Sequence, residues 1–159
     1  MGLNSGIYKL LFVLHILAVV VGFGPWMVAA AFGAKARARG GREGLAVAET
    51  TYDVIRTYSE WAVYAVPILG ILLLLVSDDR WKFSQTWVSL SFLLYIVILG
   101  VAHGMYFKNL RRVNELLGAG GPSQAAELEQ RTSQAAIANG IINLLVIVVI
   151  VLMVWKPGA

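Results

Sequence analysis

Four long runs of uncharged, mostly apolar residues alternate with polar stretches along the chain. A helix needs about 20 such residues to cross the hydrocarbon core of a bilayer, within a range of about 17–25. The runs therefore predict four transmembrane helices, at residues 10–34, 61–77, 83–107 and 132–155. Because basic residues from Lys35 onward follow the first run at once, that run reads as a retained helix and not as a cleaved signal peptide.

The two longer polar stretches continue the helical pattern. Apolar residues recur at helical spacing over Gly44–Glu60, and helix-forming residues extend the third span through residues 109–117. The Gly118–Pro122 segment then stops the helix, and Ser123 is predicted to cap the start of the next one. We expect an all-α membrane protein, an up-down four-transmembrane-helix bundle with helical cytoplasmic extensions, forming one domain over residues 1–159.

The positions of the basic residues predict how the bundle is oriented. Nine of the 13 Lys and Arg residues lie in the two longer loops, and loops rich in Lys and Arg stay in the cytoplasm. Both termini and the short turn at residues 78–82 are then outside. We expect a multi-pass protein of the bacterial cytoplasmic (inner) membrane. The cytoplasmic set is Lys35, Arg37, Arg39, Arg42, Arg56, Lys108, Arg111, Arg112 and Arg131.

Composition excludes several classes of protein. The chain is 58% hydrophobic and 14% charged, with a mean hydropathy of +0.73, whereas soluble domains are about 25% charged. The absence of cysteine removes disulfides, cysteine-ligated zinc and iron–sulfur clusters. The net charge of +4 comes from loops beside the membrane, so the expected partner is the lipid bilayer and not nucleic acid.

Two histidines are the titratable side chains inside the spans, and such residues are candidates for a functional site. His15 shares a helix face with Ala18 and Gly22, which are small enough to leave room for a flat ligand such as haem or for close helix packing. His103 lies between Gly100 and Gly104, a GxxxG spacing typical of helix contacts. At 1.5 Å per residue the two histidines differ by about 20 Å in depth. One haem held by both is not expected; separate sites, or ligation across a dimer, remain open.

Asn139 and Asn143 are spaced by one turn in the fourth span, and they predict either helix packing through buried amides or a polar path. None of the spans contains Asp or Glu, which argues against a carrier that relays protons through carboxylates. No serine–histidine–aspartate or HExxH arrangement can be built from the two histidines. The absence of these arrangements favours a protein that is not an enzyme, and it leaves an uncharacterised activity open.

The first span resembles a known family. Its run from Lys9 to Pro25 carries a Leu-His-hydrophobic-Leu-Ala pattern followed by a glycine. It is similar to the opening of a bacterial family of predicted four-span integral membrane proteins of unknown function. More distantly it resembles copper-resistance-D-like proteins and HemJ-type protoporphyrinogen oxidases. The HemJ-type resemblance implies that His15 matches a haem-binding histidine, although His103 does not match that family's second position.

Three hypotheses follow from the sequence. In the first, His15 binds haem b or a metal ion, with His103 as a separate candidate. In the second, the protein is a non-catalytic scaffold or assembly subunit that binds other membrane subunits or a second copy of itself, through small-residue faces such as Gly100 and Gly104. In the third, Asn139 and Asn143 line a pore or transporter for small solutes.

Overall fold

The computed structural model describes residues 3–158 and contains four helical rods that are long and apolar enough to cross a membrane. This confirms the predicted all-α membrane bundle. Two of the rods are continuous α-helices, α1 and α6. The other two each change to a short π-helical segment partway along. In chain order the elements are α1 (Gly6–Arg39), α2 (Gly41–Asp53), η1 (Val54–Ser59), α3 (Glu60–Leu75), α4 (Thr86–Val101), η2 (Ala102–Tyr106), α5 (Phe107–Ala119), the 3₁₀ turn η3 (Pro122–Gln124) and α6 (Ala125–Trp155).

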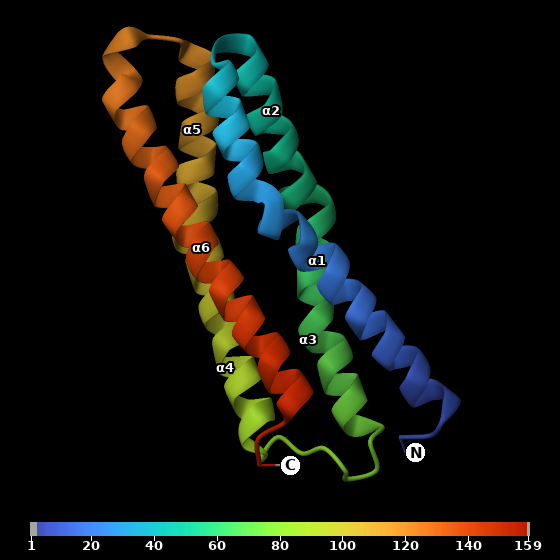
Figure 1. The fold of residues 1–159 in the computed structure, drawn as a ribbon. Helices are drawn as coiled ribbons and strands as arrows, with labels where there is room; N and C mark the ends of the chain where they lie inside the picture. The colour runs from blue at the N-terminus through green and yellow to red at the C-terminus, as the bar shows by residue number, and fades with distance from the viewer. Residues whose placement is uncertain (1–2, 159) are drawn as a thin grey trace.

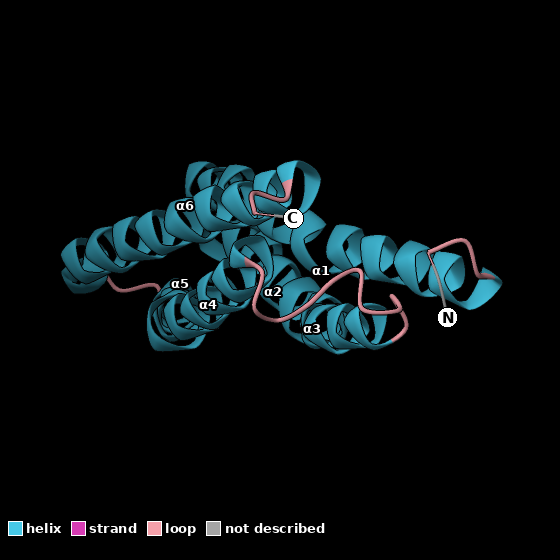
Figure 2. Ribbon diagram, turned by 90° about the horizontal axis from the view of Figure 1, so that it is seen from below, coloured by secondary structure: helices cyan, strands magenta, loops and turns pink. Residues whose placement is uncertain are grey.

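The rods run up and down as two hairpins. α1 pairs with the rod formed by α2, η1 and α3, and α6 pairs with the rod formed by α4, η2 and α5 (Figure 1). The two ends of the described chain lie at the same end of the bundle. The N-terminal half of α1 lies beside α3, away from α4 and α6, as Figure 2 also shows. The two hairpins are therefore joined most closely near the middle and at the end that carries α2 and α5.

Glycines turn the chain at the end opposite the termini. Gly40 and Gly41 have φ angles of 62° and 48°, in the region that favours glycine, and they reverse the chain between α1 and α2. Gly120, with a φ of 64°, ends α5 in the left-handed conformation common at helix C-termini. The helix end predicted at Gly118–Pro122 therefore agrees with the observed end of α5 at Ala119 to within about one residue.

Two predicted boundaries differ from the structure. Ser123 does not cap α6, because residues 122–124 form a 3₁₀ turn and the helix begins one residue beyond them. The third rod begins at Thr86, although the apolar run begins at Phe83. There the Gln85 side chain accepts a hydrogen bond from the Lys82 backbone at 3.1 Å, which holds a turn ahead of the helix.

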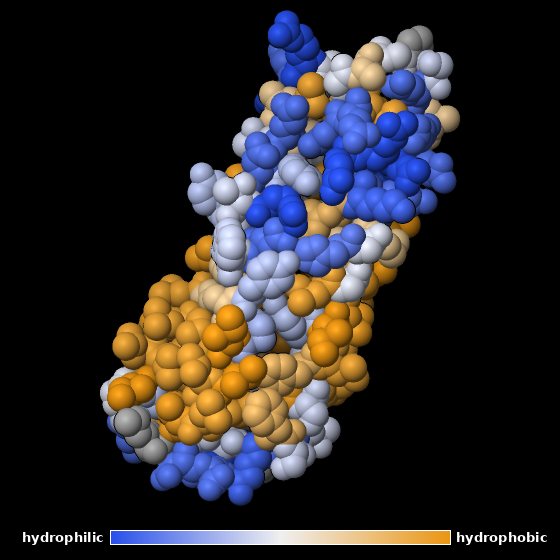
Figure 3. Space-filling view, turned by 180° about the vertical axis from the view of Figure 1, so that it is seen from behind, coloured by the Kyte–Doolittle hydropathy of each residue, from blue (hydrophilic) through white to orange (hydrophobic). Residues whose placement is uncertain are grey.

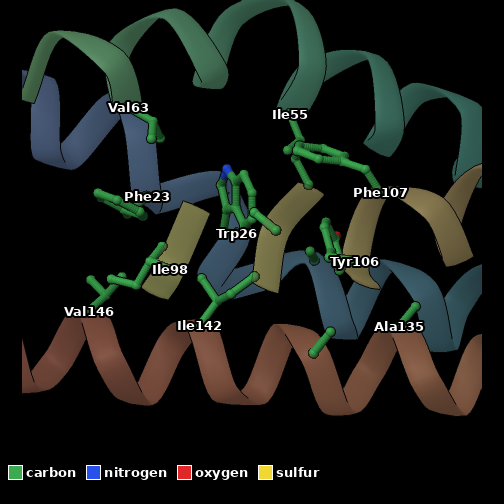
Figure 4. Close-up of a cluster of buried hydrophobic side chains, with 13 residues drawn as sticks. Phe23, Trp26, Ile55, Val63, Ile98, Tyr106, Phe107, Ala135, Ile142 and Val146 are labelled. Carbon is green, nitrogen blue, oxygen red and sulfur yellow. The ribbon is translucent and has the colours of Figure 1, made fainter. Parts of the chain in front are cut away.

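The buried core is built around an aromatic cluster in the middle of the molecule. Trp26 from α1 lies against Tyr106 and Phe107, with both pairs of ring centroids 5.3 Å apart. Ile55 of η1 and Ile142 of α6 close the cluster and are fully buried (Figure 4). The core thus ties all four rods together where the two π-helical segments lie.

Each proline inside a helix frees a backbone carbonyl, and another helix supplies a hydroxyl to it. Pro25 lacks the N–H that would bond Val21, and the Ser59 hydroxyl lies 3.3 Å from that carbonyl oxygen. Pro67 likewise frees Val63, whose carbonyl accepts a hydrogen bond of 2.8 Å from Tyr95 of α4. The second bond joins the two hairpins inside the membrane.

The outer surface carries an apolar band between two hydrophilic ends (Figure 3). At the end with the termini, Lys156 lies 4.2 Å above the Trp81 ring, and Trp81 bonds the Tyr8 hydroxyl at 3.1 Å. Burial, and to a lesser extent the charge of Arg80, lowers the pKa of Lys156. The band is the surface that a bilayer would cover, and the hydrophilic end opposite the termini carries α2 and α5.

Candidate functional site

The two π-helical segments each deliver one charged or titratable side chain to the same region of the bundle. η1 carries Arg56 and η2 carries His103. A π-helical turn widens the helix by one residue and is found frequently at functional sites. Glu60 directly follows η1 and contacts His103 of the third rod. Phe107 directly follows η2 and contacts Arg56 of the second rod. The region is therefore a candidate site built by both hairpins.

A chain of polar contacts links these residues. Arg56 Nη1 bonds Glu60 Oε1 at 2.6 Å, and the Tyr64 hydroxyl donates to the same oxygen at 2.8 Å. The Tyr64 oxygen lies 3.0 Å from His103 Nε2, and the two rings are stacked with an interplanar angle of 2°. Since the hydroxyl proton of Tyr64 is directed to Glu60, Nε2 of His103 donates the last bond of the chain.

The glutamate and the tyrosine of this chain were not singled out from the sequence. Glu60 lies one residue before the second predicted span, and its side chain is only 13% exposed. The spacing of Arg56, Glu60 and Tyr64 at successive helical turns is the signal that could have found them. That spacing is common on soluble helices, so it gains meaning only once His103 is seen beside it.

His15 lies apart from this cluster, against α3. A Cβ added to Gly70 would be 3.5 Å from His15 Cε1, so the missing side chain lets the ring pack closely. Nδ1 of His15 is buried and has no hydrogen-bond partner among residues 3–158. His103 instead contacts α3 near its start, at Glu60 and Tyr64. The structure therefore does not bring the two histidines together.

The residues predicted to give a haem room lie at a helix crossing. Gly22 is buried, and a Cβ there would be 3.0 Å from the Val63 backbone nitrogen and 3.3 Å from the Ala62 carbonyl carbon. Ala18, one turn earlier, is partly buried. Gly22 thus serves the close approach of α1 and α3, and the space beside it is occupied by protein.

Gly100 and Gly104 face outward. Both are exposed, and a Cβ added to either would find no heavy atom of the described chain within 4 Å. The GxxxG spacing therefore plays no part in packing the helices of one chain against each other. Any close helix contact that it makes would be with another molecule.

The two asparagines of α6 face the interior. Asn139 is 2% exposed, and Asn143 Nδ2 lies 3.5 Å from the Trp26 carbonyl oxygen of α1. Within the described chain the Oδ1 atoms of both are buried without a partner. Asn143 therefore contributes to helix packing, and a polar path along these amides stays a prediction.

Few side chains of the described chain could together act as ligands of a metal ion. Across residues 3–158 no group of three or more His, Asp or Glu side chains is close enough to hold one. A metal or haem bound by the described residues would therefore have at most two such side chains as ligands, and any further ligand would come from other groups.

Comparison with known proteins adds the family. A family model described as "Predicted integral membrane protein (DUF2269)" matches residues 9–157. Neither the curated proteins nor the solved structures contain a match to the chain.

Proposed function

The chain belongs to the DUF2269 family of predicted integral membrane proteins, and on this premise we propose that it binds haem b or a metal ion through His15. The observation that supports the proposal is the buried Nδ1 atom of His15, which forms no hydrogen bond of ordinary geometry in the described chain, although the ring also lies beside the Val66 backbone. An unpaired nitrogen in an apolar region costs free energy unless a ligand or water satisfies it. From the distribution of basic residues we also infer residence in a bacterial inner membrane.

The surroundings of His15 favour a compact ligand over a large one. Gly70 leaves the ring accessible along α3, whereas the space beside Gly22 is filled by Ala62 and Val63. A haem on the Gly22 side requires α1 and α3 to separate, so its binding would be accompanied by a change in the first hairpin.

The test is an absorption spectrum of the detergent-purified protein, as isolated and after reduction with dithionite, together with a measurement of bound metal. We expect a Soret band that shifts on reduction, or a bound transition metal. The His15→Ala variant should lose that signal. The His103→Ala variant is the matched control and should keep it, because His103 is exposed and already hydrogen-bonded to Tyr64. A wild-type protein that is colourless and metal-free after expression with added haem would refute the proposal.

A second candidate is supported by the outward-facing glycines. In this function the protein is a subunit of a membrane assembly, and a helix of another subunit or of a second copy packs on Gly100 and Gly104. Enlarging both to isoleucine should release the partner or dissociate the oligomer in detergent. Ile137→Phe, which enlarges an exposed side chain on α6, should leave the assembly intact. Equal behaviour of the two variants would count against this function.

A further inference from the structure

A basic pocket extends from the two π-helical segments along α5, toward the end of the bundle opposite the termini. It has a volume of about 470 Å³, within the range of small-ligand sites. Side chains from three rods line it. They are Arg56 of η1, His103 of η2, Phe107, Lys108, Arg111, Arg112 and Glu115 of α5, and Arg131 of α6.

Salt bridges within the chain neutralise only part of the positive charge. Arg112 is held by Glu127, through bonds of 2.9 Å from both Nε and Nη2, and by Glu115 at 3.1 Å. Arg56 is paired with Glu60. By contrast, Lys108 and Arg111 form no ion pair with any described residue and are exposed. The pocket therefore keeps a net positive charge.

Arg131 adds an unsatisfied donor. Its Nη1 bonds Asn109 Oδ1 at 3.2 Å, but its Nε is buried and has no hydrogen-bond partner within residues 3–158. Arg131 forms an ion pair with Glu127, whose Oε1 atom lies 3.6 Å from this nitrogen, which is longer than a hydrogen bond. A donor left unpaired in a cationic pocket is best satisfied by an anionic acceptor.

The position of the pocket indicates where the anion comes from. His103 and Phe107 belong to the part of the third rod that meets the core, whereas Lys108 and Arg111 begin its hydrophilic continuation. The hydrophilic surface at this end adjoins the apolar band directly (Figure 3). The pocket thus lies at the level of lipid headgroups, and basic pockets at that level bind anionic lipids.

We propose that this pocket binds the phosphate group of an anionic ligand, with the side chains of Lys108, Arg111 and Arg131 as its donors. A phosphodiester in a phospholipid headgroup and a soluble phosphate ester both supply the required acceptor oxygens. The proposal is independent of any ligand at His15, because His15 contacts Gly70 of α3 and does not line the pocket.

The experiment is a calorimetric titration of the purified protein with short-chain phosphatidylglycerol, phosphatidylcholine, glycerol phosphate and inorganic phosphate. The central variant is Lys108→Gln with Arg111→Gln. Each cation near a membrane surface contributes about fivefold to the affinity for an anionic lipid, so we expect binding to weaken by about 25-fold. The control is Arg39→Gln with Arg42→Gln, which removes the same charge from exposed positions at the same end outside the pocket.

The outcomes separate the two sources of phosphate. Binding of phosphatidylglycerol that is lost in the central variant and kept in the control supports the proposal and identifies a lipid. The same pattern with glycerol phosphate or inorganic phosphate supports it and identifies a soluble ligand. Equal loss in both variants shows charge attraction without a site and overturns it, as does an absence of binding to all four compounds.

One further variant guards against misfolding. Exchanging the two residues, Lys108→Arg with Arg111→Lys, keeps both positive charges and should keep measurable binding, with a change in affinity that reflects only the different donor geometry of Arg and Lys. If this exchange abolished binding while the protein remained folded, the cations would not be acting as the donors and the proposal would fail.

Discussion

Ser59 satisfies polar groups that would otherwise be unpaired in the apolar interior. It is fully buried, its hydroxyl accepts the indole N–H of Trp26 at 3.2 Å, and it bonds the Gly22 carbonyl. Ser59→Ala should therefore lower the free energy of unfolding by about 1–3 kcal/mol, the cost of a buried group left unsatisfied. Unfolding in SDS, followed by circular dichroism, measures the change. Ser89→Ala is the control, because Ser89 is exposed, and an equal loss in both variants would contradict the prediction.

Tyr95 likewise bonds the Val63 carbonyl that Pro67 leaves unpaired in the second rod. Tyr95→Phe removes only the hydroxyl that bonds the Val63 carbonyl, so it should destabilise the protein by about 1 kcal/mol. Pro67→Ala restores the N–H that this carbonyl lacks. In the Pro67→Ala background, Tyr95→Phe should therefore cost less, and a double-mutant cycle measures the difference. Strictly additive effects would show that the hydroxyl does not serve the proline.

The sequence identified the two candidate histidines but not the residues around them. Both histidines could be found, because titratable residues within apolar runs are rare. The partners of His103 could not be found. Glu60 and Tyr64 belong to another rod, and Tyr64, the nearer of the two along the chain, is 39 positions from His103. The unpaired state of His15 Nδ1 depends on how α1 packs on α3, and no local pattern carries that information.

Gly44 allows α1 and α2 to approach each other near the turn that joins them. A Cβ there would collide with the Ala36 carbonyl oxygen, and Ala36 is itself buried. Gly44→Ala should lower the free energy of unfolding by about 1–3 kcal/mol through overpacking. Gly33→Ala has nothing within 4 Å of the new methyl group, so it should be neutral or stabilise α1 by up to about 1 kcal/mol. Thermal unfolding of the two variants compares them, and a loss of stability in both would argue against a specific contact at Gly44.

At the level of elements, the predicted spans lie within the four rods except at the turn between the second and third, and the predicted helical extensions match α2 and α5. This success follows from hydropathy, since every backbone polar group inside a bilayer must be paired within a helix. The π-helical segments η1 and η2 were not predicted. A π-helical turn uses the same residue types as an α-helix, and here both segments form where the rods meet around Trp26. The place where the rods meet depends on tertiary packing, which the local sequence pattern does not reveal.

At the level of the whole molecule, the up-down order followed from four successive spans with the two basic connections on one side and the short turn on the other. The positions of the helices around the bundle could not be predicted in this way. The structure places the start of α1 outside the main body, along α3 alone. Hydropathy cannot specify this arrangement, because lipid-facing and protein-facing residues are equally apolar in these spans. The exposed glycine pair of the third rod shows the same limit, since GxxxG indicates a close contact without identifying the partner, and that contact stays a prediction.

Orientation in the membrane is the prediction that concerns the molecule as a whole. The two ends of the described chain lie on one side, and nine of the 13 basic residues lie on the other. An alkaline phosphatase fused after the last residue should therefore be active outside the cytoplasm, and one inserted at Gly120 should be inactive. Replacing Lys35, Arg37, Arg39 and Arg42 with glutamine leaves nearly equal numbers of basic residues on the two sides, so this variant should insert in both orientations. Full phosphatase activity at Gly120 in the unmodified chain would reverse the assigned orientation and place the phosphate pocket outside the cytoplasm.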